Sequence, residues 1–86
     1  MPEISRFFGI FIKMRFEDHL PPHFHAEYNE HTALVEIHTL MVFSGYLPPR
    51  VLGMVIEWAS EHREELLDLW ERAIHRQSLY KLPPLK

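Results

Sequence analysis

The feature that most constrains the fold is a single change in hydrophobic period, at Leu47-Pro48-Pro49. Before this point apolar residues recur at every second position, as in strands with one buried face. After it they recur every three or four positions, as on one face of a helix. Strands in the first part and helix in the second predict an α+β fold rather than alternating βαβ units.

The first part predicts a small antiparallel sheet of three to four strands. The expected strands cover residues 9–16, 24–28, 32–38 and, more briefly, 41–43. Their connections are short, which favours a meander of neighbouring strands. In the second of them, alternation places Phe24, Ala26 and Tyr28 on one face and both His23 and His25 on the other.

The second part predicts a helix packed on one face of that sheet. Pro49 suits the first helical turn. We expect one long helix over residues 49–76, which can kink near His62-Arg63; two helices, the second capped by Ser60, are the alternative. One helix would be about 40 Å long, more than a small sheet needs. Its apolar face is formed by Val51, Val55, Trp58, His62, Leu66, Leu69 and Ala73.

Composition narrows the class of protein further. The chain has 86 residues, which predicts one domain over 1–86, with 77–86 an extended tail that contains prolines. There is no cysteine, so disulfides and thiolate zinc sites are excluded. No apolar run approaches the ~18 residues of a membrane span, and we expect a cytoplasmic protein. The formal net charge of −3 argues against tight nucleic-acid binding.

Histidine is concentrated in one region, because five of the seven histidines fall between His19 and His38. Histidine can act as acid or base near neutral pH. The candidate catalytic residues for metal-free RNA cleavage are His19, His23, His25 and His38, with Arg15 or Lys13 to contact phosphate.

His23 and His25 are also candidate metal ligands, since residues two apart in a strand share a face, and His19 and Glu27 can join them. Two strand histidines lack the four ligands of a closed zinc site. Divalent metal binding is therefore expected to be weak or absent, and no cofactor is expected. Structural packing at the strand entry is the interpretation that we favour for these histidines, and a metal site is the alternative.

Several separated motifs resemble a family of small bacterial proteins described as a domain of unknown function. The strongest is the run Asp18-His19-x-Pro21-Pro22-His23-Phe24-His25; others are Gly9-Ile10, Leu47-Pro48-Pro49-Arg50, Trp58-Ala59 and His62-Arg63-Glu64-Glu65-Leu66. The family is often described in two-gene modules of toxin–antitoxin type. The resemblance therefore implies a small partner protein and no particular reaction.

The end of the helix and the tail supply candidate binding residues: Trp70, Tyr80 and Leu82. We expect them to form an apolar surface for a homodimer or a partner; the alternative is that the tail folds back on the domain's own core. Arg50 opposes the helix dipole, which predicts a salt bridge to the sheet or a bound phosphate. The predicted function is a protein-interaction module of a toxin–antitoxin-like pair, with a small ribonuclease as the alternative.

Overall fold

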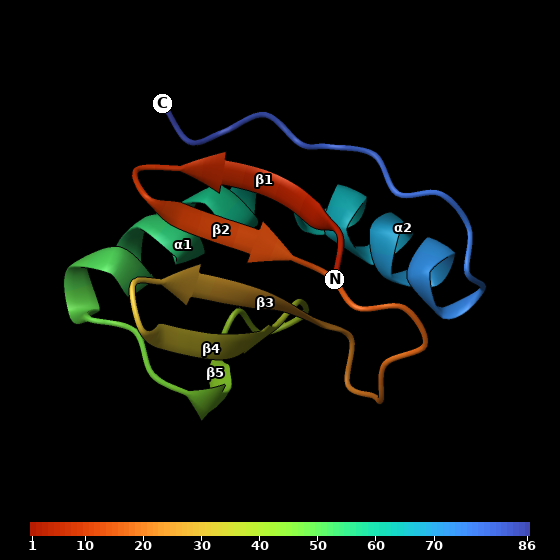
Figure 1. Cartoon of the computed structure of the whole chain (residues 1–86), viewed down its shortest axis with the longest axis horizontal. Coiled ribbons are helices and arrows are strands. Elements are labelled where there is room, and N and C mark those ends of the chain that lie inside the picture. Colours follow the sequence, from red (N-terminus) through yellow and green to blue (C-terminus); the bar gives the residue numbers. More distant parts are fainter.

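Five antiparallel strands followed by two helices make up the computed structural model, which describes residues 1–86 (Figure 1). The strands pair in sequence order, so the predicted meander is confirmed. The elements are β1 (Glu3–Phe7), β2 (Ile10–Lys13), β3 (His23–Tyr28), β4 (His31–Glu36), β5 (Val42–Gly45), α1 (Pro49–Glu61) and α2 (Arg63–Ile74).

Strand β1 was not among the predicted strands, so the expected number of three to four is wrong. It pairs with β2, but the register shifts between Glu3 and Ser5. Both Ile4 and Ser5 are buried as a result, although they are adjacent. An irregularity of this kind removes the strict alternation on which sequence-based strand prediction depends.

Strand β5 forms the other edge of the sheet and runs beyond the predicted 41–43. Its pairing with β4 is irregular near Phe43, because Val42 faces Val35 and Ser44 faces Leu34. Gly45 ends the strand with φ +81°, where a Cβ would collide with the backbone oxygen of Thr32. A residue with a side chain would therefore disrupt this end of β5.

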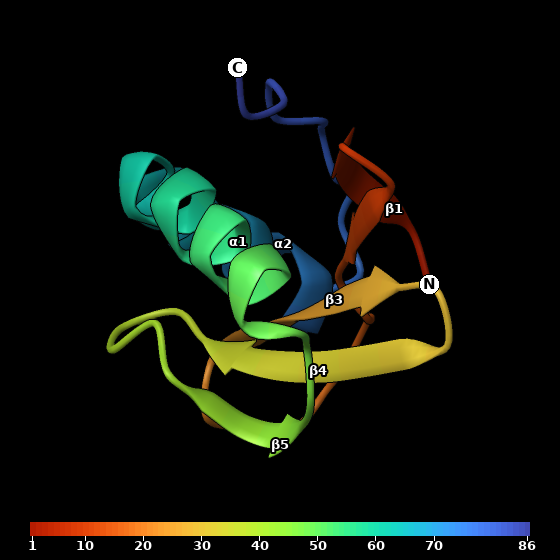
Figure 2. The ribbon, with the colours of Figure 1, turned by 90° about the vertical axis from the view of Figure 1, so that its left-hand side faces the viewer.

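One face of the sheet packs against the helices and forms the core (Figure 2). The predicted alternation of β3 is confirmed: Phe24 and Ala26 are fully buried in that core. Trp58 of α1 is also fully buried, with its ring 5.4 Å from Phe7 and 6.0 Å from Phe24 between centroids. The remaining apolar positions of the predicted helical face are buried as well: Val51, Val55, Leu66, Leu69 and Ala73.

The helical region is divided in two at His62, so the single long helix is wrong and the alternative of two helices holds. His62 has φ −127° and ψ 22°, which is not helical, and it precedes the first residue of α2. Ser60 does not cap α2, since its hydroxyl donates to the Glu57 carbonyl at 2.7 Å. A straight helix of about 40 Å would exceed the longest extent of the molecule, 33 Å.

The tail over residues 77–86 folds back along β1, as the alternative in the sequence analysis has it. The Leu82 N–H donates to the Ile4 carbonyl at 2.8 Å, and the Ser5 hydroxyl donates to the Leu82 carbonyl at 3.1 Å. The Trp58 indole N–H donates to the Pro83 carbonyl at 2.8 Å. Leu82 is only 5% exposed, so the tail completes the core of its own chain.

Neither helix is long and apolar enough to span a membrane.

Candidate functional site

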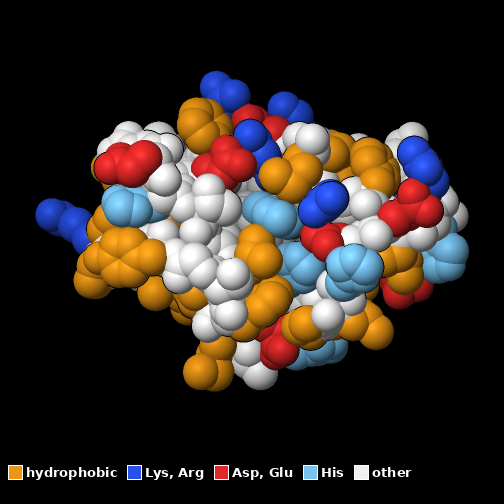
Figure 3. All heavy atoms as spheres, turned by 60° about the horizontal axis from the view of Figure 1, so that its bottom comes forward, with side chains coloured by type: hydrophobic (Ala, Val, Ile, Leu, Met, Phe, Trp, Pro, Cys, Tyr) orange, Lys and Arg blue, Asp and Glu red, His pale blue; other side chains and the backbone are white.

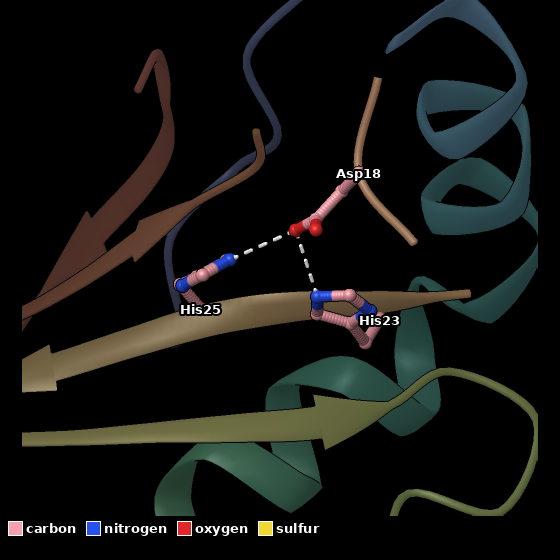
Figure 4. Close-up of side chains that lie close together, drawn as sticks. All are labelled: Asp18, His23 and His25. Atoms are coloured by element: carbon pink, nitrogen blue, oxygen red, sulfur yellow. Dashed lines mark hydrogen bonds and ion pairs between the residues drawn. The ribbon is translucent and has the colours of Figure 1, made fainter. Parts of the chain in front are cut away.

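The candidate site is a cluster of Asp18, His23 and His25, formed where the β2–β3 connection folds back over the start of β3 (Figure 4). Asp18 Oδ2 lies 2.9 Å from His23 Nε2 and 3.3 Å from His25 Nε2. Both imidazoles come from β3, on the face opposite Phe24, as alternation predicts. One carboxylate oxygen is therefore shared by two imidazole nitrogens.

Hydrogen bonds outside the cluster orient two of these three side chains. His23 Nδ1 lies 2.7 Å from the Pro21 carbonyl oxygen. Because a carbonyl only accepts, Nδ1 is the donor in this contact, and Nε2 is the ring nitrogen that faces Asp18. The His19 backbone N–H donates to Asp18 Oδ1 at 2.8 Å, which leaves Oδ2 for the imidazoles. The Pro-rich segment therefore fixes both the carboxylate and one ring.

The connection itself is anchored to the end of α2 and to the residue that follows β4. The Glu17 N–H donates to the Ala73 carbonyl at 3.1 Å, and the Glu17 carboxylate pairs with Arg76 at 2.8 Å. At its other end, the Pro22 carbonyl accepts from the Ile37 N–H at 2.9 Å. These contacts hold the segment in place, so the position of Asp18 follows from the tertiary fold.

The cluster is almost removed from solvent. The side chains of Asp18, His23 and His25 are 9%, 5% and 12% exposed. Burial acts to raise the pKa of Asp18, but hydrogen bonds from the His19 amide and from His25, with the attraction of His23, outweigh it. The pKa therefore lies below its ordinary value, and Asp18 is a carboxylate near neutral pH.

Aromatic rings surround His23. Its ring centroid is 5.2 Å from that of Phe43 in β5 and 5.2 Å from that of Trp70 in α2. In the space-filling view, histidine side chains gather near the middle of one face beside acidic and hydrophobic ones (Figure 3). The two hollows in the molecular surface lie elsewhere, lined by residues of the helices and the tail. The cluster is therefore a packed polar centre and has no substrate-sized cleft above it.

The other sequence candidates do not join this cluster. The His19 imidazole is exposed and only its backbone N–H takes part. His38 is exposed in the turn after β4, so the strand that was expected to reach it ends earlier. Arg15 is exposed, and Lys13 pairs with Glu27 at 2.9 Å, which places that carboxylate outside the cluster as well.

Asp18 is the member that the sequence analysis missed. It precedes His23 by five residues in a segment with no periodicity, so no strand or helix rule placed it near the histidines. The adjacent prolines were the available signal, because Pro21 and Pro22 favour a turn that brings flanking residues together. An aspartate before such a turn and a histidine directly after it could therefore have been predicted to lie close together.

The candidate binding residues have different surroundings from those expected. Trp70 is 3% and Leu82 5% exposed, so both lie in the chain's own core. Tyr80 is 36% exposed, and its hydroxyl donates to Asp68 at 2.8 Å. Arg50 is exposed and forms no ion pair, so the predicted salt bridge to the sheet is wrong.

Two imidazole nitrogens and a carboxylate oxygen that point toward one another can hold protons or bind a borderline divalent cation.

Comparison with known proteins adds a family but no activity. Neither a curated protein nor a solved structure matches this chain. A family model matches residues 9–71, which include the whole Asp18, His23 and His25 cluster. The chain therefore belongs to the family described as the domain of unknown function DUF4160.

Proposed function

We propose that this protein is an interaction module, one component of a two-protein pair of the toxin–antitoxin type. The observation that supports it is the open edge of the sheet at β5, which pairs with β4 on one side only. Large apolar side chains line this edge: Met41 is 66%, Phe43 47% and Tyr46 56% exposed. We call these residues, with strand β5, the β5 edge.

The β5 edge has the properties of a surface that accepts an added strand. An edge strand offers unpaired N–H and C=O groups, and proteins commonly shield such edges with charged residues or proline. The sequence Val42-Phe43-Ser44-Gly45 contains neither. Exposed apolar side chains beside a free backbone suit an extended segment of a partner protein that carries apolar residues of its own.

The identity of the partner class rests on the sequence motifs. The run from Asp18 to His25 and the proline-rich start of α1 resemble a family described in two-gene modules. A small protein encoded beside this one is therefore the partner that we propose for the β5 edge.

The ribonuclease alternative has no feature in its favour. General acid and base groups must reach the substrate within hydrogen-bond distance. Here His23 and His25 both contact Asp18, their side chains are nearly buried, and no hollow lies above them. His38 and Arg15, which would complete the catalytic set, lie outside the cluster.

Co-expression with the product of the neighbouring gene tests the proposal. The two proteins should co-purify as a stable complex, and Phe43→Lys should weaken it at least tenfold by calorimetry, because a charge replaces an apolar contact. Phe8→Lys is the matched control: Phe8 is 62% exposed but lies in the β1–β2 turn, away from β5, and its replacement should leave affinity unchanged.

The proposal fails if the neighbouring protein does not bind, or if Phe43→Lys binds as well as the parent. The same samples should be incubated with RNA, with and without the partner. Cleavage that disappears in His25→Ala would favour the ribonuclease instead.

A further inference from the structure

We propose that Asp18, His23 and His25 form a binding site for one divalent transition-metal ion of the zinc class. The three donor atoms all lie within 4.8 Å of one another. Imidazole nitrogen and carboxylate oxygen are the donors that zinc and neighbouring divalent ions take when no thiolate is present. The expectation of weak or absent binding counted two histidines, whereas the fold supplies a third ligand from the loop.

The two distances from the Asp18 oxygen to the imidazole nitrogens fit coordination of such an ion, and the two nitrogens lie within 4.8 Å of each other. Zinc–nitrogen and zinc–oxygen bonds are about 2.0–2.2 Å long, so two ligand atoms subtending roughly 90–110° are about 2.9–3.4 Å apart. Asp18 Oδ2 lies 2.9 Å from His23 Nε2 and 3.3 Å from His25 Nε2. Both separations fall within the range that a shared ion requires.

The hydrogen bonds behind the cluster are those that orient metal ligands. A histidine that ligates a metal usually donates its other ring N–H to a backbone carbonyl or carboxylate, which fixes the tautomer. His23 does so through Nδ1 to the Pro21 carbonyl at 2.7 Å. The carboxylate is held in the same way, since Asp18 Oδ1 accepts the His19 N–H at 2.8 Å. Two of the three ligands are therefore preorganised.

His25 is the adjustable ligand. It is the most exposed of the three, at 12%, and its only hydrogen bond is the one to Asp18. Its ring can turn to close the coordination around an ion without breaking another hydrogen bond. Three protein ligands leave one position of a tetrahedral ion for water or an outside donor.

The surroundings favour retention of the ion once bound. The rings of Phe43 and Trp70 pack against His23 and exclude water from that side of the cluster. A low local dielectric strengthens the attraction between the Asp18 carboxylate and a cation. An ion here would connect the β2–β3 loop directly to β3.

The test is calorimetric titration of the full chain, treated with EDTA and then dialysed, with zinc chloride. We expect one ion per chain with a Kd in the micromolar range or tighter, and a melting temperature raised by roughly 10–20 °C when zinc exceeds its Kd a hundredfold. Cobalt(II) should give visible absorption bands of a tetrahedral nitrogen–oxygen site.

Asp18→Asn and His25→Ala should each weaken binding about a hundredfold or more, because even an outer-shell partner is worth 10–100-fold. The matched control is His75→Ala, which removes an exposed histidine that lies 4.0 Å from Glu71 in a pair with only two ligands. It should bind zinc like the parent.

The proposal is overturned if the parent shows no saturable 1:1 binding, if both cluster variants bind like the parent, or if the control loses binding equally. Circular dichroism verifies that each variant is folded. Should Asp18→Asn not fold, the more exposed His25→Ala decides the matter. Loss of zinc binding with an intact partner complex would separate this proposal from the proposed function.

Discussion

The two edges of the sheet have opposite surroundings. At β1, the tail covers the edge: Leu82 donates to Ile4, and Ser5 donates back to Leu82. At β5, no segment of the chain lies along the edge, and Met41, Phe43 and Tyr46 are exposed. The chain thus shields one potential pairing surface and leaves the other free.

Under the proposed function, the covered edge serves the stability of the fold and the open edge serves recognition of the partner. The covered edge is joined to the core through Trp58 and Leu82, so its contacts contribute to folding. The open edge is connected to the core mainly through β4, and its apolar side chains are available to another protein. The family model includes β5 and the histidine cluster within residues 9–71, whereas β1 and the tail lie outside it.

The largest expected effect is at Trp58, which connects the core to the covered edge. Trp58→Ala removes a fully buried indole and should lower the free energy of unfolding by about 4 kcal/mol. Trp58→Phe retains most of the packing and loses the bond to Pro83, so it should cost only about 1–2 kcal/mol. Urea denaturation measures both. If Trp58→Ala melts like the parent while His25→Ala unfolds the domain, the core has been assigned to the wrong side of the sheet.

Removal of residues 79–86 should have the next largest effect. It uncovers the β1 edge and deletes Leu82, so we expect a loss of roughly 3 kcal/mol together with self-association through the exposed strand. Thermal melting and light scattering provide the two readouts. A truncated chain that is as stable and as monomeric as the parent would mean that the tail does not protect this edge.

Phe43→Ala tests the other edge and should cost less stability than a core truncation. Phe43 is 47% exposed, although its ring packs on His23, so we expect a loss of about 1 kcal/mol in the free energy of unfolding. Leu82→Ala is the corresponding truncation at the β1 edge. Because Leu82 is buried, it should lower the free energy of unfolding by about 2–4 kcal/mol. Equal costs in urea denaturation would remove the distinction between them.

The smallest effect concerns the exposed tether between Tyr80 and Asp68. The Tyr80 hydroxyl and then Arg72 donate hydrogen bonds that lower the pKa of Asp68. A lowered pKa in the folded state means that the contribution is present above the ordinary pKa of aspartate and is lost as the pH falls through the folded value. Asp68→Asn should therefore lower the melting temperature slightly at pH 7 and not at pH 2. A difference that grows toward acid would have the wrong sign.

Much of the fold was predictable because local pattern and tertiary burial agree. The alternation in β3 and the helical spacing from Val51 to Ala73 each indicate a face that is buried in the structure. Prediction failed where a tertiary contact overrides the local pattern. Ser5 is buried beneath the tail, so β1 does not show the alternation by which a strand is predicted. His62 is not helical, although the helical spacing of apolar residues continues past it from α1 into α2.

The candidate site was predictable only in part. A period of two places His23 and His25 on one face, and that placement needs no knowledge of the rest of the chain. Asp18 reaches them because Glu17 contacts Ala73 in α2 and Arg76 just after it, residues more than fifty positions away. Contacts at such separation leave no mark in the local sequence, so the third member of the cluster required the structure.

The closure of the β1 edge by the tail has a consequence for synthesis. Ser5 and the Leu82 carbonyl that it contacts are separated by 77 positions in the sequence. At about 5–20 residues per second, a ribosome needs roughly 4–15 s to proceed from one to the other. During that interval the nascent strand is an unprotected edge, and two ribosomes on one message would hold two such edges close together. Translation speed, rather than equilibrium stability, then sets how long neighbouring nascent chains can pair wrongly.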